Sequence, residues 1–231
     1  SSFLSLNKVD IASRTQKLLL DSIHAELAGR PQRPRLLLYG ESLGAKVQQA
    51  AIAAGPVDLD HYGIDAALYV GTPGGVVADT FHALCSGESI VIDRPALIPA
   101  DLAAPAIGSS DVRRPRVWFL EHDGDPVVRF RPDLLWSRPA WLPTDGTRGR
   151  NVPESMSWKP GITWAQALVD TLFATDVKPG DFQSMGHDYR ADLGGTVPAA
   201  FGLPADEATL GRLESFLRAK EVARAEQIGE E

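Results

Sequence analysis

Residues 35–44, RLLLYGESLG, constrain the fold of this chain more than any other segment. A run of apolar, strand-forming residues leads directly into Gly-x-Ser-x-Gly, and the helix-forming segment AKVQQAAIAA follows. Strand, G-x-S-x-G and helix, in this order, predict a nucleophile elbow, a sharp turn that projects a serine hydroxyl above a sheet edge. The turn is strained, and small neighbours such as Gly40 and Gly44 are expected to let strand and helix approach each other. Ser42 is therefore the candidate nucleophile.

The predicted elements around this turn indicate an α/β protein. Residues 8–28 are expected to form a helix, because Leu19, Ile23 and Leu27 recur every four positions and give it one face to bury. Apolar runs at residues 65–70 and 116–121 are expected to be strands. Helices that alternate with buried strands are typical of a parallel sheet covered on both faces. A chain of 231 residues has the length of a single domain of this kind, so one domain over 1–231 is expected.

Toward the C-terminus the pattern is less regular. We expect a short strand at 156–159, a helix at 163–174, a long loop over 176–204 and a terminal helix over 206–226 that turns its leucines inward. Residues 130–164 are crowded with Arg, Pro and Trp. This segment either forms a cap that lines a pocket for an acyl chain or packs as an irregular segment against the sheet, and the sequence leaves both open.

Composition and charge exclude several classes of function. The net charge is −7 and there is no block of Lys or Arg, so nucleic acid and anionic membrane surfaces are not expected partners. The single cysteine, Cys85, excludes an internal disulfide. No apolar run approaches the roughly 20 residues that cross a bilayer. No cluster of His, Cys, Asp and Glu has the spacing of metal ligands, so neither a metal nor another cofactor is expected.

A serine hydroxyl is a weak nucleophile, so it needs a general base, and the base needs an acid that orients it. Asp125 comes just after the predicted strand at 116–121, and His187 lies further on in SMGHDY. We expect both in loops at the carboxyl ends of strands, where ligands bind in open α/β sheets. The order nucleophile, acid, base is the one found in α/β-hydrolases. The N–H of Leu43 is expected to bind the oxyanion.

Three neighbouring residues offer alternatives. Asp123 could replace Asp125 as the acid or serve as a turn residue, but Pro126 fixes a turn that favours Asp125. His122 ends the predicted strand and could be the base or a buried, hydrogen-bonded histidine. Glu41 either tunes the site or caps the helix that follows.

Several segments carry a resemblance to a known family. RPRLLLYGESLGA, RPRVWFLEHDGDPVVRFRPDLLWSRPAWL, GITWAQALVDTLFA and GHDY resemble the actinobacterial α/β-hydrolases that are fused to N-terminal membrane-spanning helices, and the likeness runs through most of the chain. It implies an α/β-hydrolase-like parallel sheet with helices on both faces, and serine esterase or lipase activity in the cell envelope. By motif, it implies Ser42 as nucleophile, Asp125 as acid and His187 as base.

The resemblance also implies that a membrane-spanning region and the first strands of the sheet precede residue 1. Only 41 residues precede Ser42, and they supply one predicted helix, no strand and no loop for a second oxyanion donor. We therefore expect the early strands on another polypeptide or in a preceding region, with membrane anchoring and an extracytoplasmic location.

Together these observations predict a serine hydrolase that cleaves small-molecule or lipid carboxylic esters through an acyl-enzyme. The same residues would make an acyltransferase if an alcohol, rather than water, resolved that intermediate. The alternative from a different class is a hydrolase-like domain that binds an envelope lipid or a protein partner without catalysis.

Overall fold

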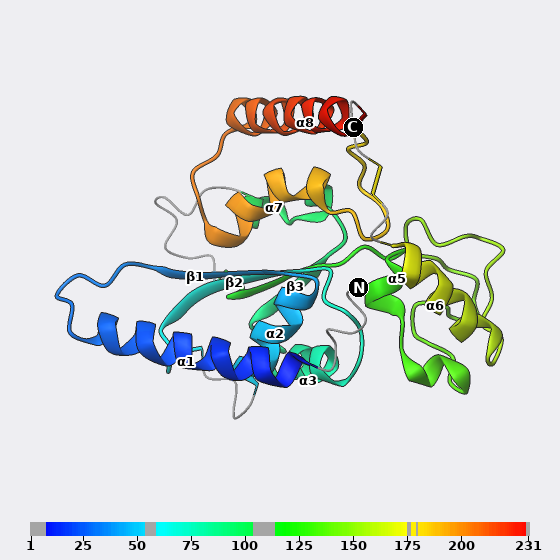
Figure 1. Cartoon of the computed structure of the whole chain (residues 1–231), viewed down its shortest axis with the longest axis horizontal. Helices are drawn as coiled ribbons and strands as arrows, with labels where there is room; N and C mark the ends of the chain where they lie inside the picture. The colour runs from blue at the N-terminus through cyan, green and yellow to red at the C-terminus, as the bar shows by residue number, and fades with distance from the viewer. Residues whose placement is uncertain (1–7, 54–58, 104–113, 175–176, 179, 230–231) are drawn as a thin grey trace.

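The computed structural model describes residues 8–53, 59–103, 114–174, 177–178 and 180–229. The centre of the described part is a four-stranded, all-parallel sheet with the order β1-β2-β4-β3 (Figure 1). The strands are β1 (Leu36–Glu41), β2 (Ile64–Val70), β3 (Ser89–Ile92) and β4 (Val117–Leu120). The two central strands, β2 and β4, are almost entirely buried, which explains their continuous apolar sequences. The expected parallel sheet is confirmed.

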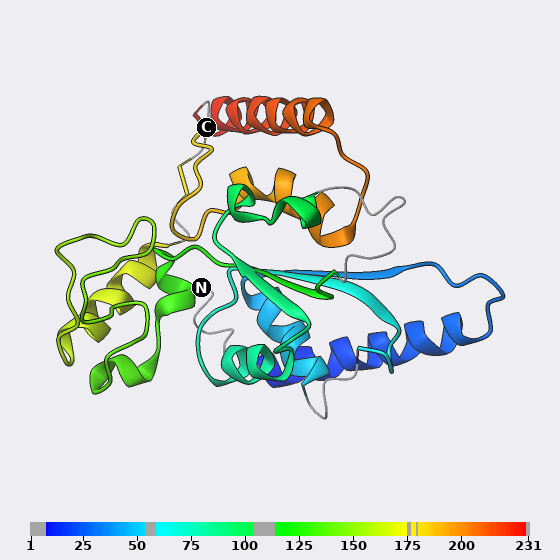
Figure 2. The same cartoon turned by 180° about the vertical axis from the view of Figure 1, so that it is seen from behind.

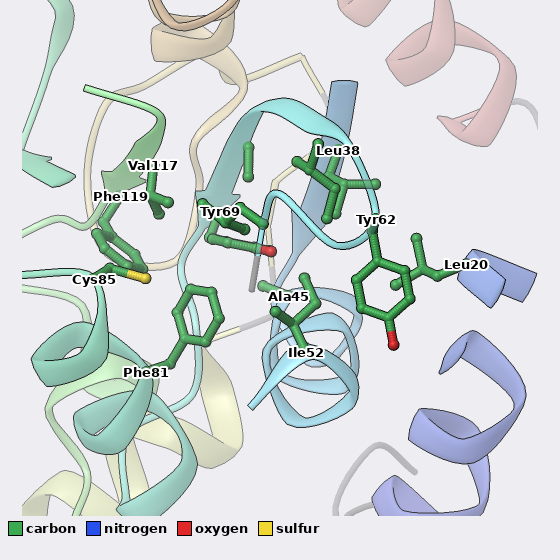
Figure 3. Packing of buried hydrophobic residues seen from close by; sticks show 13 residues of the cluster. Leu20, Leu38, Ala45, Ile52, Tyr62, Tyr69, Phe81, Cys85, Val117 and Phe119 are labelled. Carbon is green, nitrogen blue, oxygen red and sulfur yellow. The ribbon is translucent and has the colours of Figure 1, made fainter. Parts of the chain in front are cut away.

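One face of the sheet is covered by α1 (Val9–Ala28), α2 (Leu43–Ile52) and α3 (Val76–Leu84), as Figures 1 and 2 show. Aromatic rings from β2, α3 and β4 fill the space beneath them, and the rings of Tyr69 and Phe81 meet edge to face with their centroids 5.3 Å apart (Figure 3). On α1, Val9 and Leu20 are buried and Ile23 and Leu27 are partly buried, whereas Leu19 is 52% exposed. The predicted helix is therefore confirmed, and of the three residues expected on its buried face only Leu19 is exposed.

The opposite face is covered by α7 (Arg190–Phe201), together with η2 (Pro95–Leu97) and α4 (Ala100–Ala103). The prediction of a long loop over 176–204 was wrong at residues 190–201, which form α7. Paired glycines and an internal proline give α7 weak intrinsic helix propensity, so packing against β2 and β4 stabilises it instead. The glycines serve this packing: a Cβ at Gly195 would lie 2.8 Å from Pro95 Cβ.

The terminal helix α8 (Glu207–Gly229) lies over α7 on the side away from the sheet (Figure 1). The helix was predicted, but Leu213 is exposed rather than turned inward. The buried residue of α8 is Glu221, which forms an ion pair with Arg190 of α7. Of the helices in the described residues, none is both long and apolar enough to cross a bilayer.

Beside the sheet lie α5 (Pro126–Arg129), η3 (Pro132–Leu135) and α6 (Ile162–Phe173) (Figure 1). Residues 156–159 contain no strand, contrary to the prediction. Their polar groups bond to the elements on either side: Trp158 Nε1 donates to the carbonyl of Leu134 in η3 at 3.1 Å, and the Lys159 backbone N–H donates to Thr163 Oγ1 in α6 at 2.8 Å. This segment therefore joins η3 to α6 instead of extending the sheet.

Candidate active site

Ser42 occupies the tip of the turn between β1 and α2. Its backbone has φ 50° and ψ −121°, a conformation that L-residues rarely adopt. The Ser42 N–H donates to Val70 O at 2.8 Å, which fixes the turn at the carboxyl end of β2. A Cβ at Gly40 would lie 2.8 Å from Ala45 Cα, so glycine is required there, whereas a Cβ at Gly44 would meet nothing within 4 Å. The steric role expected for Gly44 is therefore not observed.

His187 lies between the two other predicted side chains. Its Nε2 is 2.9 Å from Ser42 Oγ, and its Nδ1 is 2.7 Å from Asp125 Oδ2. Asp125 is fully buried and is the N-cap of α5, where its Oδ1 accepts a hydrogen bond from the Val127 N–H at 2.8 Å. A carboxylate only accepts hydrogen bonds, so Nδ1 carries the proton and the lone pair of Nε2 faces the hydroxyl. This arrangement allows a proton to pass from the hydroxyl to the imidazole.

His187 does not follow a strand, contrary to expectation; it lies in the segment that connects α6 to α7. Space for it comes from Gly71, at the end of β2, which has φ +55°. A Cβ at Gly71 would lie 2.9 Å from His187 Cε1 and 2.5 Å from Tyr189 Cε2. The absence of a side chain at Gly71 therefore lets the loop before α7 reach Ser42.

Tyr189 is a second buried contact of Asp125 that the sequence analysis missed. Its hydroxyl donates to Asp125 Oδ2 at 2.6 Å and accepts from the His122 N–H at 3.1 Å. Burial, together with the nearby charge of Asp125, raises the pKa of Tyr189 well above its usual value, so the hydroxyl stays protonated and donates. Asp125 thus receives hydrogen bonds from Val127, His187 and Tyr189. In the sequence, the only indication that Tyr189 lies near the site was its position two residues after the candidate base.

His122 and Asp192 form a buried pair behind this site. His122 Nδ1 lies 2.8 Å from the carbonyl oxygen of Gly186, and Nε2 lies 2.8 Å from Asp192 Oδ2. Since a carbonyl only accepts, Nδ1 donates to Gly186, and Nε2 faces the Asp192 carboxyl group. Both ring nitrogens are therefore occupied, and the alternative in which His122 is the base is wrong. The pair instead holds the residue that precedes His187.

The two other alternative residues, Asp123 and Glu41, form hydrogen bonds away from His187. Asp123 accepts from Arg129 Nη2 at 3.2 Å and from the Arg150 N–H at 3.2 Å, and its bonds do not include His187. Glu41 accepts from the hydroxyl of Tyr39 at 2.9 Å, and α2 has no side-chain cap. Neither side chain therefore takes part in the contacts around His187.

A cavity of about 800 Å³ opens beside Ser42 and His187. Its apolar wall comes from α3, α5, η3 and the loops that flank them, and it includes Val76 and Trp136, which are 81% and 65% exposed. Other residues of segment 130–164 pack internally, since Leu134 and Leu142 are fully buried. Some residues of segment 130–164 therefore line the cavity, and others pack as an irregular segment, so each of the two interpretations applies to part of it. In the described residues, no group of three or more His, Cys, Asp or Glu side chains is placed to hold a metal ion.

A parallel α/β sheet with a strained serine between a strand and a helix, hydrogen bonded to histidine and then aspartate, is the arrangement found in serine hydrolases of the α/β class. A comparison with protein-family models agrees, because the model of the alpha/beta-hydrolase family matches residues 1–88 and 93–204. The chain therefore belongs to the α/β-hydrolase family. Searches of curated proteins and of solved structures found no match. The family match includes Ser42, Asp125 and His187 and ends before α8.

Proposed function

We propose that this protein is a serine hydrolase that cleaves carboxylic esters. The observation that carries the proposal is the unbroken chain of hydrogen bonds from Ser42 Oγ through His187 to Asp125, at 2.9 and 2.7 Å, beside a cavity with apolar walls. The cavity volume of about 800 Å³ suits a substrate of small-lipid size, and its apolar wall suits an acyl chain.

In the proposed reaction, Ser42 Oγ attacks the carbonyl carbon of the ester while His187 Nε2 takes the hydroxyl proton. The tetrahedral intermediate places its oxyanion at the Leu43 N–H. Leu43 is the first residue of α2, so this N–H has no acceptor within the helix and lies at the positive end of the helix dipole. When the C–O bond to the alcohol breaks, His187 returns its proton to the departing oxygen, and an acyl-enzyme remains.

Water completes the cycle by the same steps. His187 takes a proton from the water, whose oxygen attacks the acyl carbon, and Ser42 leaves with the proton that His187 returns. Asp125 keeps Nδ1 protonated and stabilises the imidazolium that forms twice in each cycle. If an alcohol replaces water, the same residues perform acyl transfer.

The Ser42→Ala, His187→Ala and Asp125→Asn variants test this proposal on 4-nitrophenyl esters with acyl chains of increasing length. We expect kcat to fall by about 10⁴-fold or more in each, because the three residues act as a unit. His24→Ala is the matched control, since His24 lies on α1 and stacks on His61 away from the site. Full activity of Ser42→Ala would contradict the proposal. Ester binding without turnover by the native protein would instead support a non-catalytic binding domain.

We also propose that the protein acts at the cell envelope, with further strands from outside this chain completing its sheet. The proposal is supported by the resemblance to hydrolases fused to membrane helices and by the position of β1, which pairs only with β2 within the described residues. An added strand beside β1 could bring a second oxyanion donor near Ser42. Cell fractionation tests the location: the full-length protein is expected in the membrane fraction, and recovery only in the soluble fraction would contradict it.

A further inference from the structure

Two basic side chains, Arg131 and Lys46, line the cavity, and neighbouring carboxylates balance the first of them. Arg131 forms ion pairs with Asp79 at 2.6 Å and with Asp133 at 3.1 Å, so its charge is balanced by two carboxylates. Glu41 accepts its hydrogen bond from Tyr39. The summed charge of these residues is neutral or negative. The whole chain is also negative, with a net charge of −7.

Lys46 is the exception on this wall. It lies on the first turn of α2, where its backbone N–H donates to the carbonyl of Ser42 at 3.2 Å. Its ammonium group has no hydrogen-bond or ion-pair partner among the described residues. The side chain is half-buried, and burial lowers the pKa of Lys46 with no carboxylate to oppose the shift. Partial burial of an uncompensated cation costs free energy, and most lysines avoid it by extending into water.

We infer that Lys46 binds an anionic group of the substrate, a carboxylate or a phosphate, so that the enzyme prefers esters that join an apolar chain to a negative charge. The inference rests on the proposed ester hydrolysis, whose site it extends. The apolar wall holds the chain, and Lys46, one helical turn after Ser42, lines the same cavity. In an acidic protein, an anionic substrate needs such a local cation to approach the site.

The first test compares 4-nitrophenyl hexanoate with mono-4-nitrophenyl adipate, which has the same acyl length but a terminal carboxylate. The ratio of kcat/KM for the anionic ester to that for the neutral one is expected to fall about tenfold in Lys46→Met, as for a lost hydrogen bond to a charged group. Lys46→Arg is expected to keep the native ratio, because it keeps the charge. Lys220→Met, on exposed α8, removes the same charge elsewhere and should leave the ratio unchanged.

A second pair of substrates places the anion on the alcohol: phenyl hexanoate and the same ester with a phosphate on the ring. A Lys46-dependent preference in the adipate pair alone identifies a carboxylate on the acyl side, and one in the phosphate pair alone identifies a phosphate on the alcohol side. Either outcome supports the inference. Native ratios in Lys46→Met for both pairs would overturn it, even if Ser42-dependent hydrolysis is observed.

A binding measurement separates this inference from the proposed function. In the Ser42→Ala background, calorimetry with mono-hexyl adipate and with hexyl phosphate is expected to give a Kd about tenfold higher when Lys46 is also replaced by Met. If the native protein hydrolyses no ester but this difference is found, the ester hydrolysis fails and the anion site stands. If Lys46→Met changes neither Kd, the inference is wrong.

Discussion

Gly71 determines where His187 lies, and its replacement tests the site at the scale of one residue. In Gly71→Ala the new methyl group would meet His187 Cε1 at 2.9 Å and Tyr189 at 2.5 Å, so the imidazole must move away from Ser42. We expect kcat to fall by at least about 100-fold, because displacement of a catalytic group by 1 Å has this effect. Steady-state kinetics on 4-nitrophenyl esters measures the loss.

Gly87→Ala provides the matched control, since Gly87 also has positive φ but a Cβ there would meet nothing within 4 Å. Both variants should lose about 1–2 kcal/mol of unfolding free energy from backbone strain. Gly71→Ala should lose roughly 1–3 kcal/mol more from its clash with the buried ring of Tyr189, and it alone should lose activity. Equal activity losses in the two variants would show that strain, rather than displacement of His187, is responsible.

The reactivity of Cys85 tests the packing of the core and does not depend on catalysis. The thiol is buried beside α3, and burial raises its pKa to about 11, so little reactive thiolate forms near neutral pH. We expect no reaction with a thiol reagent at pH 8 in the native protein, and one equivalent of reaction after denaturation, because Cys85 is the single cysteine. Rapid labelling of the native protein would show that the core around Phe81 is not packed as described.

The sequence predicted the residues around Ser42 because their signals are local or follow a fixed order along the chain. Tyr189 and the His122–Asp192 pair were not predicted as such, since neither a motif nor a fixed order along the chain points to these contacts. Asp123 and Asp125 have similar local sequences, and Pro126 gave the one cue that separated them.

At the scale of elements, α7 and the segment before it hold the imidazole in place. Tyr189→Phe removes a donor to Asp125 without touching the cavity, because Tyr189 does not line it. We expect kcat to fall about 10- to 100-fold, the effect of losing one hydrogen bond to a charged group, while KM stays nearly unchanged. Tyr62→Phe is the control, as Tyr62 lies on the other face of the sheet. A change in KM alone would contradict a positioning role for Tyr189.

Prediction of the elements succeeded where intrinsic preference and packing agree, as in β1, α2 and β4. It failed at α7, whose glycines and proline disfavour a helix until the sheet packs against it. It also failed at residues 156–159, where Trp158 and Lys159 donate hydrogen bonds to Leu134 and Thr163 instead of pairing with a strand.

At the scale of the whole molecule, the sheet has two apolar cores, one on each face, and neither includes a residue of α8. The family match also ends before α8 begins. We therefore expect deletion of residues 206–231 to leave the thermal midpoint within a few degrees and kcat/KM unchanged. Unfolding of the shortened protein would show that the Arg190–Glu221 pair and its surroundings are required for the fold.

The central claim is that Ser42 is made nucleophilic by His187, and a fluorophosphonate probe tests it most directly. Peptide mapping of the labelled full-length protein is expected to find one adduct, on Ser42, that is absent from Ser42→Ala and forms about 10³-fold more slowly in His187→Ala. His24→Ala should label at the native rate. No adduct on Ser42, or equal labelling rates in the native protein and His187→Ala, would contradict the claim.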